Sequence, residues 1–128
     1  MIGANSVGGD PGGASSSTVL TFPHQRSEPQ VGFERPELTR ILDLYGRMVA
    51  AGEWRDYAMS FGKDAANFAA FRRTAERPTA RIEKRPALRA KQGMWTLFGE
   101  AGQVLKRGHE LAGVLSVLER RLLKIVED

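Results

Sequence analysis

The sequence predicts an α+β fold, in which a small antiparallel sheet of about four strands is flanked by an N-terminal and a C-terminal helix. Apolar residues recur at helical spacing near both ends of the region with globular composition. Segments with period-two patterning lie between those two stripes. Strands and helices do not alternate as they would in a doubly wound parallel sheet, so helices packed on one face of an antiparallel sheet are expected.

Residues 1–32 predict a disordered tail, and residues 33–128 predict a single α+β domain. The tail is rich in glycine and serine, which offer little apolar surface to bury. One apolar island interrupts it at Val19, Leu20 and Phe22. This island either stays unstructured or forms a short strand or anchor that docks on the domain or on a partner.

A first helix is predicted to begin near Pro36, because proline fits the first helical turn without loss of a hydrogen bond. Gly52 is placed to follow its end. The apolar stripe that predicts this helix consists of Leu38, Ile41, Leu42, Tyr45, Met48 and Val49.

The pattern then changes to period two over residues 54–61, which predicts a strand. Asp64 is expected to cap a short helix over residues 65–73. Phe68 and Phe71 would lie on one side of that helix, because they are three residues apart.

A second strand is predicted over residues 80–88, and Pro86 indicates that it ends there or lies at an edge. Residues 94–98 and 103–107 flank a glycine-containing loop and predict a hairpin. A last helix is expected to follow Gly108. Its stripe is Leu111, Leu115, Leu118, Leu122 and Ile125, with Val114 and Val126 beside it.

Several chemistries are excluded by composition. The chain has no cysteine, so it has no disulfide, no thiol nucleophile and no metal site built on thiolates. His24 and His109 are not spaced as a metal-binding pair. No apolar run approaches the roughly 20 residues of a membrane span, and no signal peptide is visible. These observations favour a cytoplasmic bacterial protein with no cofactor and no membrane partner.

The formal net charge is +4, and residues 72–91 alone carry a net charge of +6. A dense basic block of this kind is typical of a surface that meets a polyanion. With the nearby Lys106 and Arg107, the candidate polyanion-binding residues are Arg72, Arg73, Arg81, Lys84, Arg85, Arg89, Lys91, Lys106 and Arg107.

In a strand, residues two apart share a face, so Arg81 and Arg85 should face one way with Glu83 between them. Lys84 should face the other way with Ile82. A sheet face with several guanidiniums can hold a phosphate backbone, because each planar fork meets two oxygens. Two alternatives stay open: a solvated face whose arginines pair with nearby acids, or a surface for an acidic protein.

Trp54, Tyr57 and Trp95 lie in or beside predicted strands. Exposed rings there could stack on bases or mark a protein interface. The alternative for all three is packing in the core. No RNP-like pattern or GXXG loop is present, so no named RNA-binding module is indicated.

A catalytic interpretation would use Glu53 or Asp56 as a general base, with Arg47 or Arg55 holding an anion. The alternative is a salt-bridged corner between the first helix and the first strand. No nucleophile lies beside a histidine in the sequence. We therefore expect a binding domain rather than an enzyme.

The last helix offers a second interface. Its leucines and Ile125 step by four and three residues, as in a heptad seam, although the seam covers barely two heptads. Either the helix packs on its own sheet, or surplus apolar surface pairs with a second copy or another protein.

Five segments are similar to a family of small alphaproteobacterial proteins known as domain of unknown function 2794. They are FERPEL at 33–38, YGRMVAAGEWRDYA at 45–58, FRR at 71–73, RIEKRP at 81–86 and VLKRGHEL at 104–111. The resemblance implies a compact bacterial domain over residues 33 to about 115, and it brings no activity, cofactor or catalytic residue.

From the residues themselves we expect a domain that binds a polyanion such as RNA or DNA through the basic block. The alternative is a protein-interaction adaptor that uses the amphipathic C-terminal helix and can form a homodimer.

Overall fold

The computed structural model describes residues 29–73 and 77–127, and the predicted tail 1–32 lies almost wholly outside them. Within these residues, two helices and five strands follow one another, with one short 3-10 turn, η2. Their bounds are α1 Arg35–Ala50, β1 Asp56–Phe61, β2 Ala66–Phe71, β3 Ala80–Lys84, η2 Pro86–Leu88, β4 Trp95–Phe98, β5 Val104–Gly108 and α2 Leu111–Glu127.

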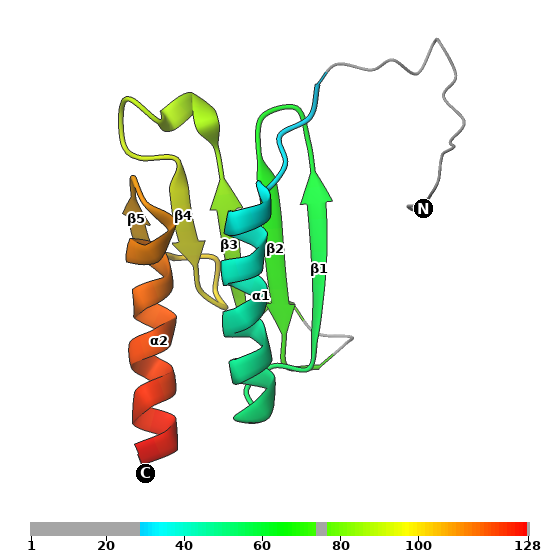
Figure 1. Cartoon of the computed structure of the whole chain (residues 1–128), viewed down its shortest axis with the longest axis vertical. Coiled ribbons are helices and arrows are strands. Elements are labelled where there is room, and N and C mark those ends of the chain that lie inside the picture. Colours follow the sequence, from blue (N-terminus) through cyan, green and yellow to red (C-terminus); the bar gives the residue numbers. More distant parts are fainter. Residues whose placement is uncertain (1–28, 74–76, 128) are drawn as a thin grey trace, which may run out of the picture.

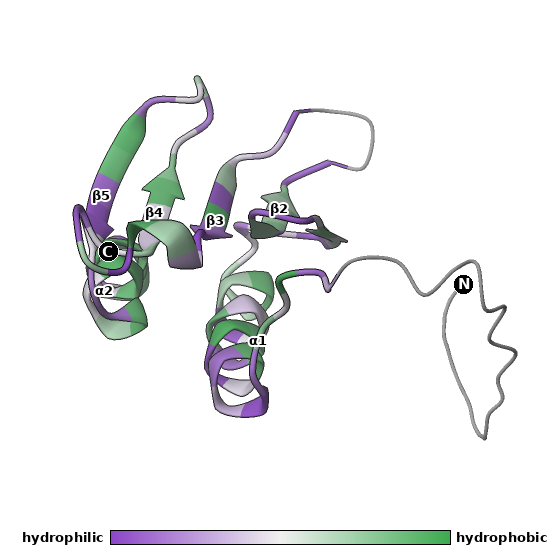
Figure 2. Cartoon of the chain, turned by 90° about the horizontal axis from the view of Figure 1, so that it is seen from above, coloured by the Kyte–Doolittle hydropathy of each residue, from purple (hydrophilic) through white to green (hydrophobic). Residues whose placement is uncertain are grey.

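The strands form one sheet in the order of the chain, and every neighbouring pair is antiparallel. Both helices lie on the same side of this sheet, as Figures 1 and 2 show together. The α+β class and the positions of the two helices are therefore confirmed. The sheet has five strands where the sequence predicted about four.

Helix α1 begins and ends where the sequence predicts. Pro36 stands in its first turn, and the backbone N–H of Glu34 donates to the carboxylate of Glu37 at 2.8 Å. Gly52 follows the helix with a φ of 80°, which favours glycine. The core side of the helix includes Leu44, which the predicted stripe omitted.

The helix predicted over residues 65–73 is wrong, because residues 66–71 form β2. Gly62 donates its N–H to the carbonyl of Ala65, so the chain reverses tightly after β1 and returns beside it. Alternate residues of β2 are then buried, Phe68 fully. Pairing with β1 and β3 outweighs the helix propensity of an alanine-rich segment.

The second predicted strand is confirmed over its first half only. It ends at Lys84, and Pro86 begins η2 instead of continuing the ladder. The hairpin of β4 and β5 is confirmed, with a register shift between Leu97 and Phe98.

The core lies between the sheet and the two helices. In α2 the predicted stripe is confirmed from Leu111 through Leu115 and Leu118 to Leu122, which are buried, whereas Ile125 is only partly buried. The largest fully buried side chains elsewhere are Trp95, Phe68, Ile41, Leu44, Met48, Ile82 and Leu97.

The other side of the sheet is covered by no described element, and we call it the open face (Figure 2). Side chains alternate along a strand, so the neighbours of the buried residues stand on this face. The strand registers place these residues side by side. The open face consists of Asp56, Ala58, Ser60, Asn67, Ala69, Phe71, Arg81, Glu83, Arg85, Thr96, Phe98, Val104 and Arg107.

Candidate polyanion interface

Three arginines stand on the open face. Arg81 comes from β3, Arg85 follows directly after that strand, and Arg107 comes from β5. The structure confirms that Arg81 and Arg85 share a face with Glu83, because both guanidiniums bond to its carboxylate. It also confirms that Ile82 points the other way into the core.

Arg81 is held across three strands. One guanidinium nitrogen donates to the amide oxygen of Asn67 on β2, and it lies 3.5 Å from the carboxylate of Glu83. The guanidinium carbon lies 4.1 Å from the centre of the Phe98 ring on β4. A cation over a ring face is attracted by the ring quadrupole. The side chain is nevertheless 34% exposed, so it meets solvent in a fixed position.

Two nitrogens of the Arg85 guanidinium donate hydrogen bonds to the Glu83 carboxylate, each at 3.3 Å from a different oxygen. Such a two-point contact fixes the plane of the guanidinium. The Glu83 side chain is only 12% exposed, since both arginines cover it.

Arg107 completes the group from the far side of β4. It donates to the hydroxyl of Thr96 at 3.2 Å and to the amide oxygen of Gln92 at 2.7 Å. Two guanidiniums thus bond to one carboxylate, and a third lies across β4 from it, which leaves a net positive charge on this part of the open face. A guanidinium has more N–H donors than these contacts use, so each can still donate to a phosphate.

The structure separates two of the predicted basic residues from this group. Lys84 is 6% exposed and bonds to Glu37 on the helix side, so its inclusion in the interface is wrong. Lys106 is exposed but lies on the other side of β5 from Arg107.

The remaining basic residues lie around the sheet. Arg72, just beyond β2, has a guanidinium nitrogen 3.6 Å from the carboxylate of Glu53. Arg73 is exposed beside it. Arg89 and Lys91 are exposed in the segment between η2 and β4, which also carries Gln92, the partner of Arg107.

Two of the predicted stacking residues are core residues. Trp54 is 3% exposed and Trp95 is 2% exposed, so neither ring can accept a base. Tyr57 is 39% exposed, but it lies on the helix side, where its ring packs on Phe68 and Tyr45. Sequence reasoning missed Phe98, the aromatic residue beside Arg81. Alternation with the buried Leu97 is the signal that would have found it.

The chain matches one family model, described as "Protein of unknown function (DUF2794)", over residues 31–115. The chain belongs to the DUF2794 family. Comparison with curated proteins found no match, and neither did comparison with solved structures.

The DUF2794 match contains all five strands and ends inside α2. Every residue of the open face therefore lies within it, whereas the second half of α2 lies beyond it. Since the family carries no assigned function, the chemistry of this DUF2794 domain has to be argued from its own side chains.

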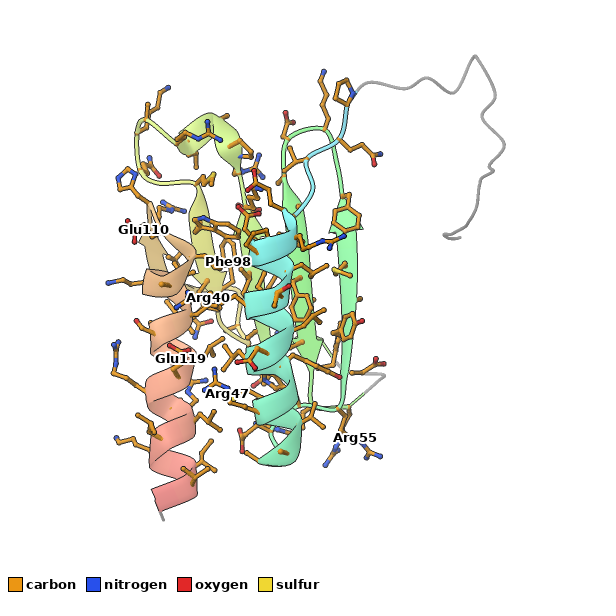
Figure 3. The ribbon with its side chains drawn as sticks, in the orientation of Figure 1. Arg40, Arg47, Arg55, Phe98, Glu110 and Glu119 are labelled. Atoms are coloured by element: carbon orange, nitrogen blue, oxygen red, sulfur yellow. The ribbon has the colours of Figure 1, made fainter. Side chains whose placement is uncertain are left out.

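The residues that a catalytic interpretation would use do not lie together in one site. Glu53 pairs with Arg72, whereas Arg47 lies between the helices, 3.3 Å from Glu119 (Figure 3). Arg55 points away from Arg47, at the end of the molecule (Figure 3). Desolvation raises the pKa of Tyr45, so at neutral pH its phenol stays protonated and offers no base.

His109 is exposed just before α2. Among the described residues, no group of three or more His, Cys, Asp or Glu side chains could hold a metal ion. Within the same residues, neither helix is both long and apolar enough to cross a membrane.

A separate apolar groove lies between the C-terminal ends of α1 and α2. Its volume is about 350 Å³, and it is lined by Arg47, Ala50, Ala51, Leu122, Leu123 and Val126. Leu123 is 57% exposed and Val126 is 63% exposed, so these two side chains are the apolar surplus of α2.

Proposed function

We propose that this DUF2794 domain binds nucleic acid, RNA or DNA, on the open face of its sheet, without catalysing a reaction. The observation that carries the proposal is the presence of three guanidiniums on one face: Arg81 and Arg85 share the carboxylate of Glu83, and Arg107 is held by Thr96 on the next strand. A phosphodiester chain is the common biological ligand that presents repeated anionic oxygens to such a group.

The geometry of this group suits a phosphate backbone. β3 and β5 are separated by one strand, so Arg81 and Arg107 rise from strands about 10 Å apart. Neighbouring phosphates of one strand could therefore each meet a guanidinium. The three side chains are already fixed by Asn67, Glu83 and Thr96, which lowers the conformational entropy lost on binding.

Further positive charge stands at one end of the open face. Arg89 and Lys91 are exposed in the segment that leads into β4. This segment is tied to the interface, because Gln92 accepts a hydrogen bond from Arg107. A nucleic acid that crosses the sheet would meet these cations next.

The salt dependence of binding tests the proposal. If about four side chains neutralise phosphates, log affinity for duplex DNA should fall with log salt with a slope of about −3.6. For a single strand the slope should be about −2.8. The double variant Arg81→Gln, Arg85→Gln should reduce either slope to about half, measured by fluorescence anisotropy of labelled RNA and DNA.

A matched control keeps the net charge equal. Arg40 on α1 and Arg121 on α2 are both exposed on the helix side. The variant Arg40→Gln, Arg121→Gln removes the same charge from the opposite side, and it should leave the slope close to that of the wild type. Absence of binding to any probe at low ionic strength, where screening is weakest, would remove nucleic acid as the ligand.

The apolar groove between the helices favours a second candidate, an adaptor that binds an acidic amphipathic helix of another protein. Arg47 is the charged residue among those that line the groove, beside the apolar Leu123 and Val126, and a cation there complements an acidic partner. The variant Leu123→Lys separates the two functions. It should leave the affinity for nucleic acid unchanged. If Leu123→Lys instead lost this affinity while the variant Arg81→Gln, Arg85→Gln kept it, the nucleic-acid site would be the groove.

A further inference from the structure

The contact between Arg81 and Phe98 places an aromatic ring beside a cation, which the binding of phosphates does not require. The ring of Phe98 stands on the open face, and the guanidinium of Arg81 lies 4.1 Å from its centre. Asn67 and Glu83 hold this guanidinium from the other sides. The result is a partly exposed pair of planar groups in a fixed position.

We propose that the open face takes a single strand, with one unpaired base stacked on the Arg81–Phe98 pair and the adjacent phosphates on Arg85 and Arg107. This inference rests on the proposed function and narrows its ligand from nucleic acid in general to unpaired RNA or DNA. Bases stack on aromatic rings and on guanidinium planes with little preference for sequence.

The side chains next to this pair leave room for a base. Ala58, Ala69, Arg81 and Phe98 lie in one row across four strands. The two alanines form a low floor on the β1–β2 side of Arg81. Phe71 lies two residues from Ala69 on the same face and is partly exposed, so a second ring stands close to that floor.

The shape of the sheet disfavours a duplex. Five strands extend about 19 Å across the sheet, whereas the major groove of B-DNA is about 12 Å wide and admits a two-stranded ribbon but not a sheet of this width. A paired base is also stacked within its helix and cannot reach Phe98. A single strand can turn its bases outward onto the sheet.

The inference predicts different affinities for two probes of equal charge. One is a labelled oligothymidylate, and the other is an abasic phosphodiester strand of the same length. We expect the wild-type protein to bind the strand with bases roughly 5- to 150-fold more tightly, as one stacked base provides. Phe98→Leu should remove most of this difference, while affinity for the abasic strand stays within about twofold.

Phe61→Leu is the matched control. Phe61 is 43% exposed and lies on the helix side of β1, where its ring contacts Phe33. This variant loses an exposed ring of the same kind, and it should keep the full preference for bases. Circular dichroism and thermal unfolding of both variants show whether each keeps the fold.

Each outcome decides between the two proposals. Equal affinity for the strands with and without bases would overturn single-strand stacking and leave a purely electrostatic interface. Tighter binding of a matched duplex would also overturn it. Failure of every probe to bind at low salt would overturn the proposed function itself. If Phe98→Leu does not fold, the two probes on the wild-type protein still decide.

Discussion

Lys84 on β3 donates a 2.7 Å hydrogen bond to the carboxylate of Glu37 in the first turn of α1. The two side chains are only 7% and 16% exposed. The ammonium also donates to the carbonyl of Gly32 at 2.9 Å and lies 5.8 Å from the centre of the Trp95 ring. One carboxylate thus neutralises a buried lysine and also accepts the backbone N–H of Glu34.

The first prediction concerns this ion pair. Lys84→Met should destabilise the domain by about 3 kcal/mol, because Glu37 is left nearly buried without its cation. Guanidinium denaturation measures the change. Lys106→Met is the control at an exposed lysine, and it should change stability by less than about 0.5 kcal/mol.

A double-mutant cycle isolates the pair itself. Combining Lys84→Met with Glu37→Gln should cost about 1–3 kcal/mol less than the sum of the two single changes, because each single change leaves a partner group behind. Additive costs would mean that Lys84 acts mainly through Gly32 and the Trp95 ring.

The second prediction tests the core side of α2. Leu118 is 1% exposed, and Leu118→Ala should cost about 2–5 kcal/mol through lost burial and the cavity that remains. Leu123→Ala on the same helix removes an exposed side chain and should cost far less. Equal losses in thermal or denaturant unfolding would contradict the assigned faces of the helix.

The third prediction concerns the close approach of two backbones. Gly93 has a φ of 99°, and a Cβ there would lie 2.4 Å from the carbonyl carbon of Gly108. Gly93→Ala should therefore cost at least about 2 kcal/mol. Gly113→Ala is the comparison, since a Cβ at this helical glycine meets open space and should stabilise by about 0.5–1 kcal/mol.

The fourth prediction is a monomer in solution at micromolar concentration. The seam that could pair two copies of α2 is buried against its own sheet and α1, which leaves Leu123 and Val126 as its most exposed apolar side chains. A specific interface usually buries at least about 1,000 Å². Light scattering should give the mass of one chain. A dimer that dissociates in the Leu123→Lys variant would show instead that two copies pair through α2.

Much of the fold could be predicted because its signals are local. Each helix carries its own apolar stripe and its own boundaries, as Pro36 and Gly52 show for α1. The faces of residues 81–85 also follow from alternation alone, so the positions of Arg81, Glu83 and Arg85 were predicted correctly. β2 was missed because its alanines favour a helix locally, whereas two neighbouring strands supply the backbone partners that outweigh this preference.

By itself, the sequence determined the two helices, the hairpin and the side of β3 on which its arginines stand. The tertiary structure decided which residues meet, because that depends on strand order and on which face the helices cover. Lys84 contacts Glu37, which is 47 residues away in the sequence, and Trp54 and Trp95 are buried in the core. The register of β3 and β4 places Phe98 beside Arg81. Local patterns specify the direction of a side chain, but contacts between distant segments specify its neighbours and its exposure.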